Sequence, residues 1–454
     1  MELNLSIIDK FLIYGYFILI LIIGLLSPAK KNQDDYIVIG RKLSIVPFSI
    51  SLVATWYGGI LGIGEFTFKY GISNWFVFGF PYYIFAILFA LFFANKINQE
   101  KIITIPDRLR KNFGNTAGFL SAIIISIISS PAPYILSCAL LINFIFNISI
   151  FLSIILSTIL SMIYMYKSGF RSIIRTDIIQ FVFMFAGFFL LVLFCLKDYG
   201  GINYLYENIP KPHFDLLGGN NIQYILVWFF IGLWTFIDPN FYQRCIAAKN
   251  DKTAKYGILI SVLFWMIFDF LTLISGLYCV AILSDNINEV LAFPYLGIKI
   301  LPPFIKGVFF IGLFSTIMST IDSMGFLSSV TIGRDFFWRI TKKYNEEIWT
   351  KLSLPITGSI SIVIVYFFSS VIEIWYFIGS IMIPGLIIPF IITFSKKITI
   401  RKPTYIIIIP IMISILWNVF KDPNKGYIFG IEPFFMGLIS SLLLTIIFQK
   451  KKII

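Results

Sequence analysis

Long apolar segments alternate with short polar ones along almost the whole chain. A segment of about 20 mostly apolar residues is long enough to cross the hydrocarbon core of a bilayer. Because no water satisfies the backbone there, each such segment is expected to be an α-helix. The pattern predicts an all-α polytopic membrane protein with about thirteen transmembrane helices, at about 11–27, 45–68, 73–95, 117–145, 148–166, 173–196, 222–243, 256–284, 302–331, 352–371, 374–395, 403–420 and 431–448.

The first apolar segment has the length of a signal-peptide core, but no basic stretch precedes it and no small-residue cleavage site follows it, so we expect a span. The basic residues then indicate orientation. With the N-terminus outside, 28 of the 36 Lys and Arg residues, Arg244 among them, fall on the cytoplasmic side. Basic residues are retained on that side. The split predicts a multi-pass protein of the cell inner (plasma) membrane with a cytoplasmic C-terminus.

Composition supports this class. The 454 residues are 58% hydrophobic and 13% charged, whereas soluble domains carry about 25% charged residues. A net charge of +13 in a soluble protein would suggest nucleic acid, but here retention of basic loops explains it, and no nucleic-acid partner is expected. The four cysteines are widely spaced and His213 is the single histidine, so no metal or cofactor site is expected. The sequence shows no nucleotide-binding loop and no nucleophile–base pair, so we do not expect an enzyme. We expect one transmembrane domain, 1–454.

Two predicted spans carry helix-breaking residues. The second contains four glycines within seven residues, and each weakens a helix by about 1 kcal/mol relative to alanine. They permit either close helix packing or an unwound segment whose carbonyls line a site. The seventh contains Gly232 and then Asp238-Pro239, where proline removes a backbone donor and disfavours helix before it. Interrupted helices five spans apart are typical of inverted-repeat transporters.

Four acidic residues lie inside or at the ends of apolar segments: Glu65, Asp177, Asp238 and Asp322. Ionisable residues at membrane depth cost about 2.5–3.5 kcal/mol on insertion scales, so they are usually functional. Simpler interpretations stay open for three of them. Glu65 fits the outer mouth of the protein, and Asp177 and Asp238 fit helix N-caps.

Hydroxyl groups surround Asp322. Thr316, Ser319, Thr320 and Ser323 recur at spacings of three and four residues, on or near one helix face. Hard oxygen ligands of this kind suit a hard cation. The alternative is that each hydroxyl bonds to its own helix.

Five short motifs carry a resemblance to the sodium:solute symporter family, which includes proline, pantothenate, sialic acid, sugar and choline carriers. They are Asp35-Tyr36-x3-Gly40-Arg41-x-Leu43, Ala54-Thr-Trp-Tyr-Gly-Gly, Thr176-Asp177-x2-Gln180, Tyr242-Gln243-Arg244-x2-Ala247-Ala248 and Met318-Ser-Thr-Ile-Asp-Ser323. The resemblance implies a leucine-transporter-type inverted five-helix repeat with one extra N-terminal helix. The extra helix is then at about 11–27, the first repeat at about 45–196, the second at about 222–395 and the C-terminal helices at about 403–448.

The resemblance also implies a sodium site between the broken second span and the ninth, formed by the carbonyls of Ala54, Tyr57 and Thr316 and the hydroxyls of Ser319 and Thr320. A possible second sodium site corresponds to Asp177, Ser319, Asp322 and Ser323. This chain has an acid at 322 where the sialic acid carriers have a hydroxyl. Two sodium ions are therefore a hypothesis.

The resemblance places a solute pocket at the broken spans, with Trp56, Gly58, Leu61, Trp234 and Asp238. Tryptophans and a carboxylate attract a cation, although the tryptophans also fit as bundle packing. The implied function is sodium-coupled symport of a small organic solute by alternating access, with an amino acid or a quaternary ammonium compound favoured. A proton-coupled carrier of the same fold and a transporter-like solute sensor are the alternatives. Sodium is the expected coupling ion, and the bilayer and the solute are the expected partners.

Overall fold

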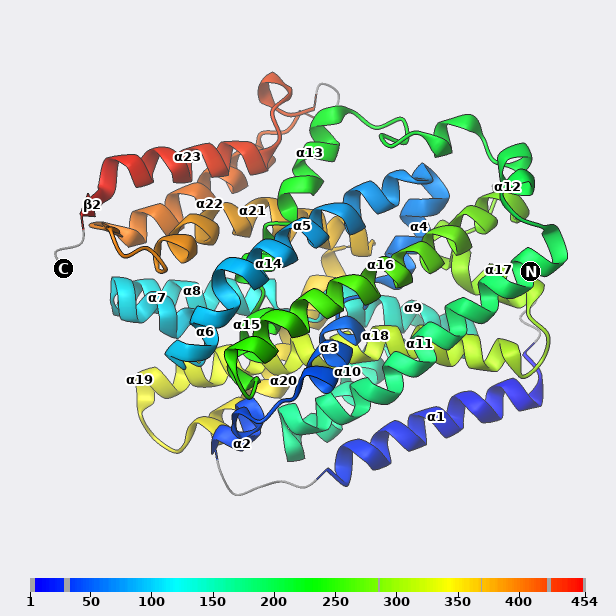
Figure 1. Ribbon diagram of the computed structural model, residues 1–454, viewed down its shortest axis with the longest axis horizontal. Helices are drawn as coiled ribbons and strands as arrows, with labels where there is room; N and C mark the ends of the chain where they lie inside the picture. The colour runs from blue at the N-terminus through cyan, green and yellow to red at the C-terminus, as the bar shows by residue number, and fades with distance from the viewer. Residues whose placement is uncertain (1–4, 28–32, 285, 369, 423–425, 452–454) are drawn as a thin grey trace.

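The protein is a bundle of α-helices, most of which run side by side along the longest axis of the molecule (Figure 1). The computed structural model describes residues 5–27, 33–284, 286–368, 370–422 and 426–451. Within these residues, the only β-structure in named strands is the antiparallel pair of β1 (Ile398–Ile400) and β2 (Gln449–Lys451).

The helices of the first half are α1 Ile7–Leu25, α2 Gln33–Val38, α3 Ile45–Ala54, α4 Ile60–Tyr70, α5 Phe80–Phe89, α6 Asn95–Glu100, α7 Ile105–Phe113, α8 Asn115–Ile128, α9 Ala132–Phe146, α10 Ile150–Ser168, α11 Phe170–Tyr199 and α12 Ile202–Asn208. Those of the second half are α13 Ile222–Ile231, α14 Trp234–Ile237, α15 Pro239–Ala247, α16 Asp251–Ile282, α17 Ala292–Ile300, α18 Ile305–Val330, α19 Arg339–Thr341, α20 Glu346–Phe367, α21 Val371–Ile392, α22 Pro403–Val419 and α23 Pro433–Phe448. Wide π-helical turns lie at Trp75–Gly79, Ala90–Ala94 and Thr331–Trp338.

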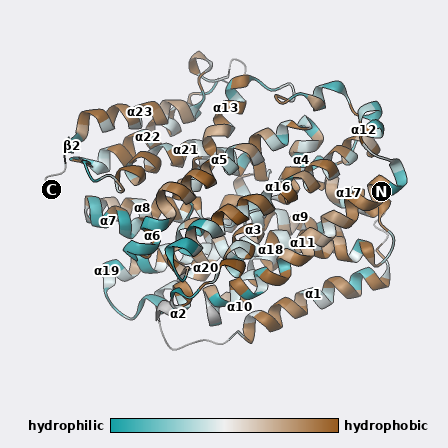
Figure 2. Cartoon of the chain, in the orientation of Figure 1, coloured by the Kyte–Doolittle hydropathy of each residue, from teal (hydrophilic) through white to brown (hydrophobic). Residues whose placement is uncertain are grey.

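The apolar segments of the sequence are helical in the structure. Among the described residues, ten helical segments are long and apolar enough to cross a membrane, and α3, α22 and α23 are shorter apolar helices. Each of the thirteen predicted segments overlaps one of these elements, which confirms the helical fold class. Hydrophilic residues gather around α6, α7 and α19 at one end of the bundle and α12 at the other, with apolar helix surface between (Figure 2). The number of crossings and their direction remain predictions.

Both predicted interruptions are present. The second predicted span divides into α3 and α4, and Thr55–Gly59 joins them without regular helix. The seventh divides at Asp238, whose backbone is extended (φ −75°, ψ 118°), before α15 begins at Pro239. Asp238 caps α15, because its Oδ1 accepts a hydrogen bond from the backbone N–H of Asn240 at 2.7 Å. A helix C-terminus leaves its last carbonyls without helical partners, so both breaks expose polar backbone inside the bundle.

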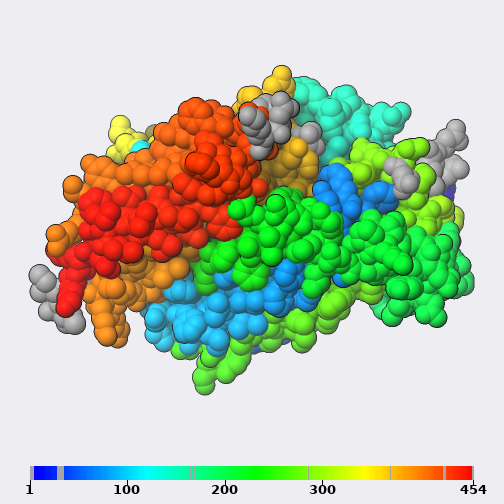
Figure 3. All heavy atoms as spheres, turned by 90° about the horizontal axis from the view of Figure 1, so that it is seen from above, coloured from blue at the N-terminus to red at the C-terminus, as the bar shows by residue number. Residues whose placement is uncertain are grey.

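Helix α18 forms the centre of the bundle. Every residue from 309 to 330 is buried, although the helix is rich in hydroxyl groups. It packs along α11 and also contacts α1, α9 and α20. The C-terminal helices α22 and α23 are peripheral by comparison, and they cover one end of the face seen in Figure 3 (orange to red) beside the segment around α13 (green).

One residue of the predicted cytoplasmic loops is elsewhere. Arg244 lies on α15 and is fully buried, so counting it as a loop residue was wrong. The helix that restarts at Pro239 carries its side chain into the bundle interior, where acidic and hydroxyl side chains surround it. A charge count along the sequence cannot reveal this, because it depends on which helices pack against α15.

Candidate functional site

The first break lies directly against α18. Gly58 approaches Thr320 of α18 and Tyr134 of α9 so closely that an added Cβ would lie 2.7 Å from Thr320 Oγ1 and 2.6 Å from Tyr134 Cδ1. Such distances are too short for non-bonded heavy atoms, so glycine is required for this approach. The glycines of the second span therefore serve close packing and a helix break together, and the two readings of the sequence are compatible.

The predicted sodium ligands lie on the two sides of this contact. Ala54 is the last residue of α3 and Tyr57 lies in the break. On α18, Thr316 Oγ1 donates to Gly312 O at 2.7 Å and Thr320 Oγ1 donates to Thr316 O at 3.3 Å. The hydroxyls thus bond to their own helix, as the alternative interpretation stated. A donating hydroxyl keeps its lone pairs and a carbonyl oxygen has two of them, so these bonds leave the predicted ligand atoms, Thr316 O and Thr320 Oγ1, able to coordinate a cation.

Ser319 points to a different partner. Its hydroxyl donates to Asp177 Oδ1 at 2.7 Å, and Ser51 of α3 donates to Asp177 Oδ2. Asp177 is fully buried within α11, which begins at Phe170, so it does not cap the N-terminus of that helix. Asp177 therefore joins α3, α11 and α18 through hydroxyl groups.

Arg244 supplies a positive charge beside this carboxylate. Its Nη2 lies 3.6 Å from Asp177 Oδ2, donates to Ser51 Oγ at 2.7 Å and to Ser323 Oγ at 3.2 Å. Its Nη1 donates to Asn240 Oδ1 at 3.0 Å. A buried carboxylate needs a partner charge or hydrogen bonds to remain ionised, and Asp177 has both. Two members of the predicted second sodium set, Asp177 and Ser323, thus face a cation that the protein itself provides.

Asp322, the remaining member of the second set, is fully buried on α18 beside Ser323. Sequence reasoning did not assign Arg244 to this site. The available signal was its position on the helix that restarts at Pro239, six residues after Asp238 and one residue after Gln243 of the Tyr-Gln-Arg motif. Nothing in the sequence pairs it with Asp177, which is 67 residues earlier.

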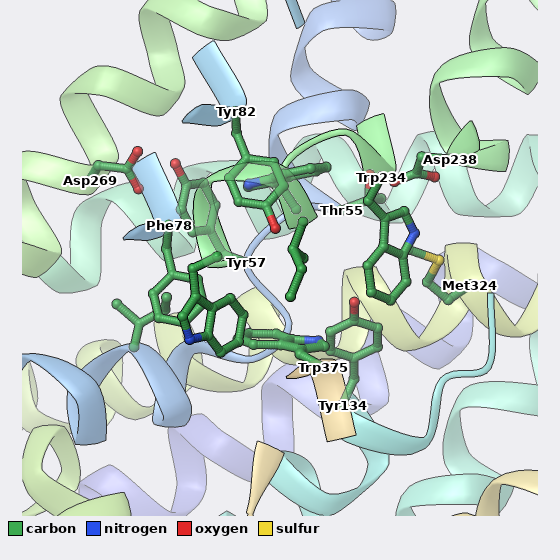
Figure 4. A pocket seen from close by; sticks show the side chains of 14 residues that line it. Thr55, Tyr57, Phe78, Tyr82, Tyr134, Trp234, Asp238, Asp269, Met324 and Trp375 are labelled. Atoms are coloured by element: carbon green, nitrogen blue, oxygen red, sulfur yellow. The ribbon is translucent and has the colours of Figure 1, made fainter. Parts of the chain in front are cut away.

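A cavity lies between the two breaks (Figure 4). Of the predicted pocket residues, Trp56, Trp234 and Asp238 line it, and so does the predicted sodium ligand Tyr57. Gly58 and Leu61 are not among the lining residues: Gly58 packs on Thr320, and Leu61 is fully buried. The aromatic wall consists of Trp56, Trp228, Trp234, Trp375, Tyr57, Tyr82, Tyr134 and Phe78.

The wall is built from aromatic pairs contributed by several helices. The Trp56 ring lies 5.0 Å from that of Tyr82 and 5.0 Å from that of Trp265. Phe78 packs edge-on against Trp228 at 4.7 Å. Offset and edge-to-face pairs at these separations add stability beyond area burial. The wall is therefore an interlocked aromatic surface, and the tryptophans both pack the bundle and face the cavity.

The acidic side of the cavity contains a residue that sequence reasoning missed. Asp269 lies in the middle of α16 and lines the cavity together with Asp238. Tyr83 donates a hydrogen bond to Asp269 Oδ2. The signal was present in the sequence, since Asp269 interrupts the apolar run 256–284 as Asp322 interrupts 302–331. Glu65, in contrast, is outside the lining set and forms an ion pair with Lys69 at 2.8 Å.

Comparison with known proteins identifies relatives of the chain. The profile of the sodium:solute symporter family matches residues 36–399. Solute carrier family 5 member 4 of Rattus norvegicus is 22% identical over 399 residues, which cover 75% of this chain and 59% of that protein. The sodium/pantothenate symporter of Haemophilus influenzae is 29% identical over 187 residues, which cover 38% of each chain. The chain thus spans less than two thirds of the length of the first of these relatives.

Solved structures share the fold. A Na+-coupled sialic acid symporter in a substrate-bound outward-open state superposes with a TM-score of 0.80 at 18% identity, covering 99% of this chain and 100% of that one. Mhp1, a nucleobase-cation-symport-1 family transporter in a closed conformation, gives a TM-score of 0.56 at 12% identity, covering 88% and 90%. At such identities the likeness concerns the fold, which is the leucine-transporter type that the family resemblance implies.

Proposed function

Because the chain belongs to the sodium:solute symporter family, we propose that it couples the movement of sodium to that of a small organic solute, with an amino acid or a quaternary ammonium compound favoured. The protein acts in the cell inner membrane, with the N-terminus outside. Each sodium ion that enters gains about 2.3 kcal/mol per 100 mV of membrane potential. No reaction chemistry is needed, since the work is done by alternating access.

One observation carries the proposal. The short break between α3 and α4 touches α18 at Thr320 through Gly58 and lines the aromatic cavity through Trp56 and Tyr57. A cation held between the break and α18 would therefore fix the backbone that positions the cavity wall. The affinity for solute then depends on the occupancy of the cation site, and this coupling is reciprocal.

The cation ligands favour sodium over a proton. The proposed ligands at the break are the backbone carbonyls of Ala54, Tyr57 and Thr316 and the hydroxyls of Ser319 and Thr320. Hard neutral oxygens of this kind suit a hard metal cation. Asp177, the carboxylate next to this group, is already matched by Arg244 and two serine hydroxyls. The second sodium site proposed at Asp177, Asp322 and Ser323 would share its space with the Arg244 guanidinium, so one sodium at the break is the better supported arrangement.

The test compares thermal unfolding of the purified protein in sodium and in potassium. Sodium at ten times its dissociation constant should stabilise the wild type by about 1.4 kcal/mol. Thr320→Ala removes one predicted ligand and should abolish the difference between the two salts. Thr331→Ala is the matched control, because Thr331 is also buried and also bonds back to its helix, with Oγ1 donating to Leu327 O at 2.9 Å.

Equal stability in sodium and potassium for the wild type would contradict sodium coupling. If acidification then stabilised the protein instead, a proton-coupled carrier would replace the proposal. A solute that stabilised the protein equally in both salts would favour a solute sensor.

A further inference from the structure

The ionisable side chains that line the cavity are acidic. Two carboxylates, those of Asp238 and Asp269, line it, and no Lys, Arg or His is among its described lining residues. In Figure 4 the two acids lie on opposite sides of the cavity, with Tyr82 between them. A solute in this space therefore meets negative charge from two directions, and no protein cation is available there to hold a solute carboxylate.

Asp269 differs from Asp177 and Glu65 in its partners. Asp177 faces Arg244, and Glu65 pairs with Lys69. Asp269 accepts a hydrogen bond from Tyr83, and no ion pair to it occurs among the described residues. An acid in the middle of an apolar helix costs free energy unless a partner charge offsets it. The partner consistent with this geometry is a positive charge on a bound solute.

Asp238 is more constrained. Its Oδ1 accepts from the Asn240 backbone at the N-terminus of α15, and Asn240 Oδ1 accepts from Arg244. The positive end of a helix and a nearby guanidinium therefore offset part of its charge. Asp269 has neither of these neighbours, so it is the stronger candidate for the cation contact.

The aromatic wall supports the same class of solute. Tryptophan and tyrosine faces attract ammonium groups, and four tryptophans and three tyrosines line the cavity.

We infer that Asp269 is a specificity-determining residue that selects a solute of net positive charge, an amine or quaternary ammonium ion without a carboxylate, over its zwitterionic counterpart. This deepens the proposed function and rests on it. A carboxylate on the solute would be repelled by Asp238 and Asp269 and would find no cationic side chain in the lining. Of the two solute classes favoured above, quaternary ammonium ions without a carboxylate therefore fit, and the zwitterionic amino acids do not.

The experiment measures binding of radiolabelled solutes to the full chain in detergent, in sodium and in potassium. The two members of each pair share an ammonium group, and only the second member carries a carboxylate. The pairs are choline and betaine, ethanolamine and glycine, and putrescine and 4-aminobutyrate. We expect the cation of at least one pair to bind at least tenfold more tightly than its partner. If every zwitterion matches or exceeds its cation, or if no cation binds at millimolar concentration, the inference is overturned.

Variants test the role of Asp269 in that preference. Asp269→Asn should reduce the cation-to-zwitterion affinity ratio at least tenfold, whereas an unchanged ratio would exclude Asp269 as the determinant. Glu432→Gln is the matched control. Glu432 also accepts a tyrosine hydrogen bond, from Tyr376 at 2.8 Å, but lies outside the lining set, so the ratio should not change.

If Asp269→Asn does not fold, the ratio of cation to zwitterion affinity of the wild type still tests the inference, because a wild type without a cation preference overturns it. The two salts separate the two proposals. A cation preference that is the same in potassium, without sodium-dependent stabilisation, would overturn sodium coupling and leave the solute class standing. Sodium-dependent stabilisation together with a preference for zwitterions would leave sodium coupling standing and overturn the inferred solute class.

Discussion

Replacing Arg244 by methionine removes a buried charge while keeping most of the side-chain volume. In the native protein this guanidinium is fully buried, lies 3.6 Å from Asp177 and donates to Ser51 at 2.7 Å and Ser323 at 3.2 Å. The substitution leaves Asp177 in the interior with two serine donors and no counter-charge. We expect a loss of about 3–5 kcal/mol in the free energy of unfolding, the range found when one partner of a buried ion pair is removed.

The double variant is the informative one. Asp177→Asn with Arg244→Met removes both charges, and replacing a buried pair by neutral groups is often close to neutral. The double variant should therefore be more stable than Arg244→Met alone, and the coupling energy of the cycle should be about 2 kcal/mol or more, within the range for residues in contact.

The assay follows unfolding by tryptophan fluorescence in mixed micelles with increasing denaturing detergent. Potassium replaces sodium throughout, so that cation binding near Asp177 does not enter the comparison. Lys351→Met is the control, because Lys351 pairs with Glu347 at 2.6 Å near the surface and such pairs contribute about 0–1 kcal/mol. Strictly additive effects of the two substitutions, or a loss for Arg244→Met no larger than for Lys351→Met, would refute the assignment of Arg244 as the counter-charge.

Two further outcomes follow from packing and charge. Gly58→Ala places a Cβ 2.6 Å from Tyr134 Cδ1, so it should lower the free energy of unfolding by about 1–3 kcal/mol and weaken the stabilisation by sodium. Gly15→Ala is the control, because its Cβ would have no atom within 4 Å and should not destabilise the protein. Thermal unfolding measures both variants. Burial alone would raise the pKa of Asp107 on α7, but the charges of Arg334, Arg339 and Arg110 outweigh burial and lower this pKa. The Asp107 carboxylate therefore stabilises the fold above its unfolded pKa of about 3.9, and this stabilisation is lost as the pH falls. Asp107→Asn should therefore melt lower than the wild type at pH 7, and the gap should narrow only below about pH 4; a gap independent of pH would contradict the charge argument.

The helical elements were predictable because lipid imposes a simple rule on the sequence. Each spanning segment must be apolar and must satisfy its own backbone, so length and hydropathy locate it. The breaks at Thr55–Gly59 and at Asp238 were predictable for a similar local reason, since glycine and proline act on the backbone of the residues that carry them. Trp56, Trp234 and Asp238 are close to these breaks in sequence, and all three line the cavity.

What the sequence alone determined about this protein is thus the helical class, the two interruptions and the residues adjacent to them. Only the tertiary structure decided that Arg244 faces Asp177, that Gly58 closes on Thr320 and that Asp269 joins the cavity. These are contacts between helices far apart in the chain, and the direction of a side chain on a helix is settled by the neighbours it packs against. The charges could therefore be counted along the sequence, but their pairing, and with it the sign of the cavity, depended on the packing of the bundle.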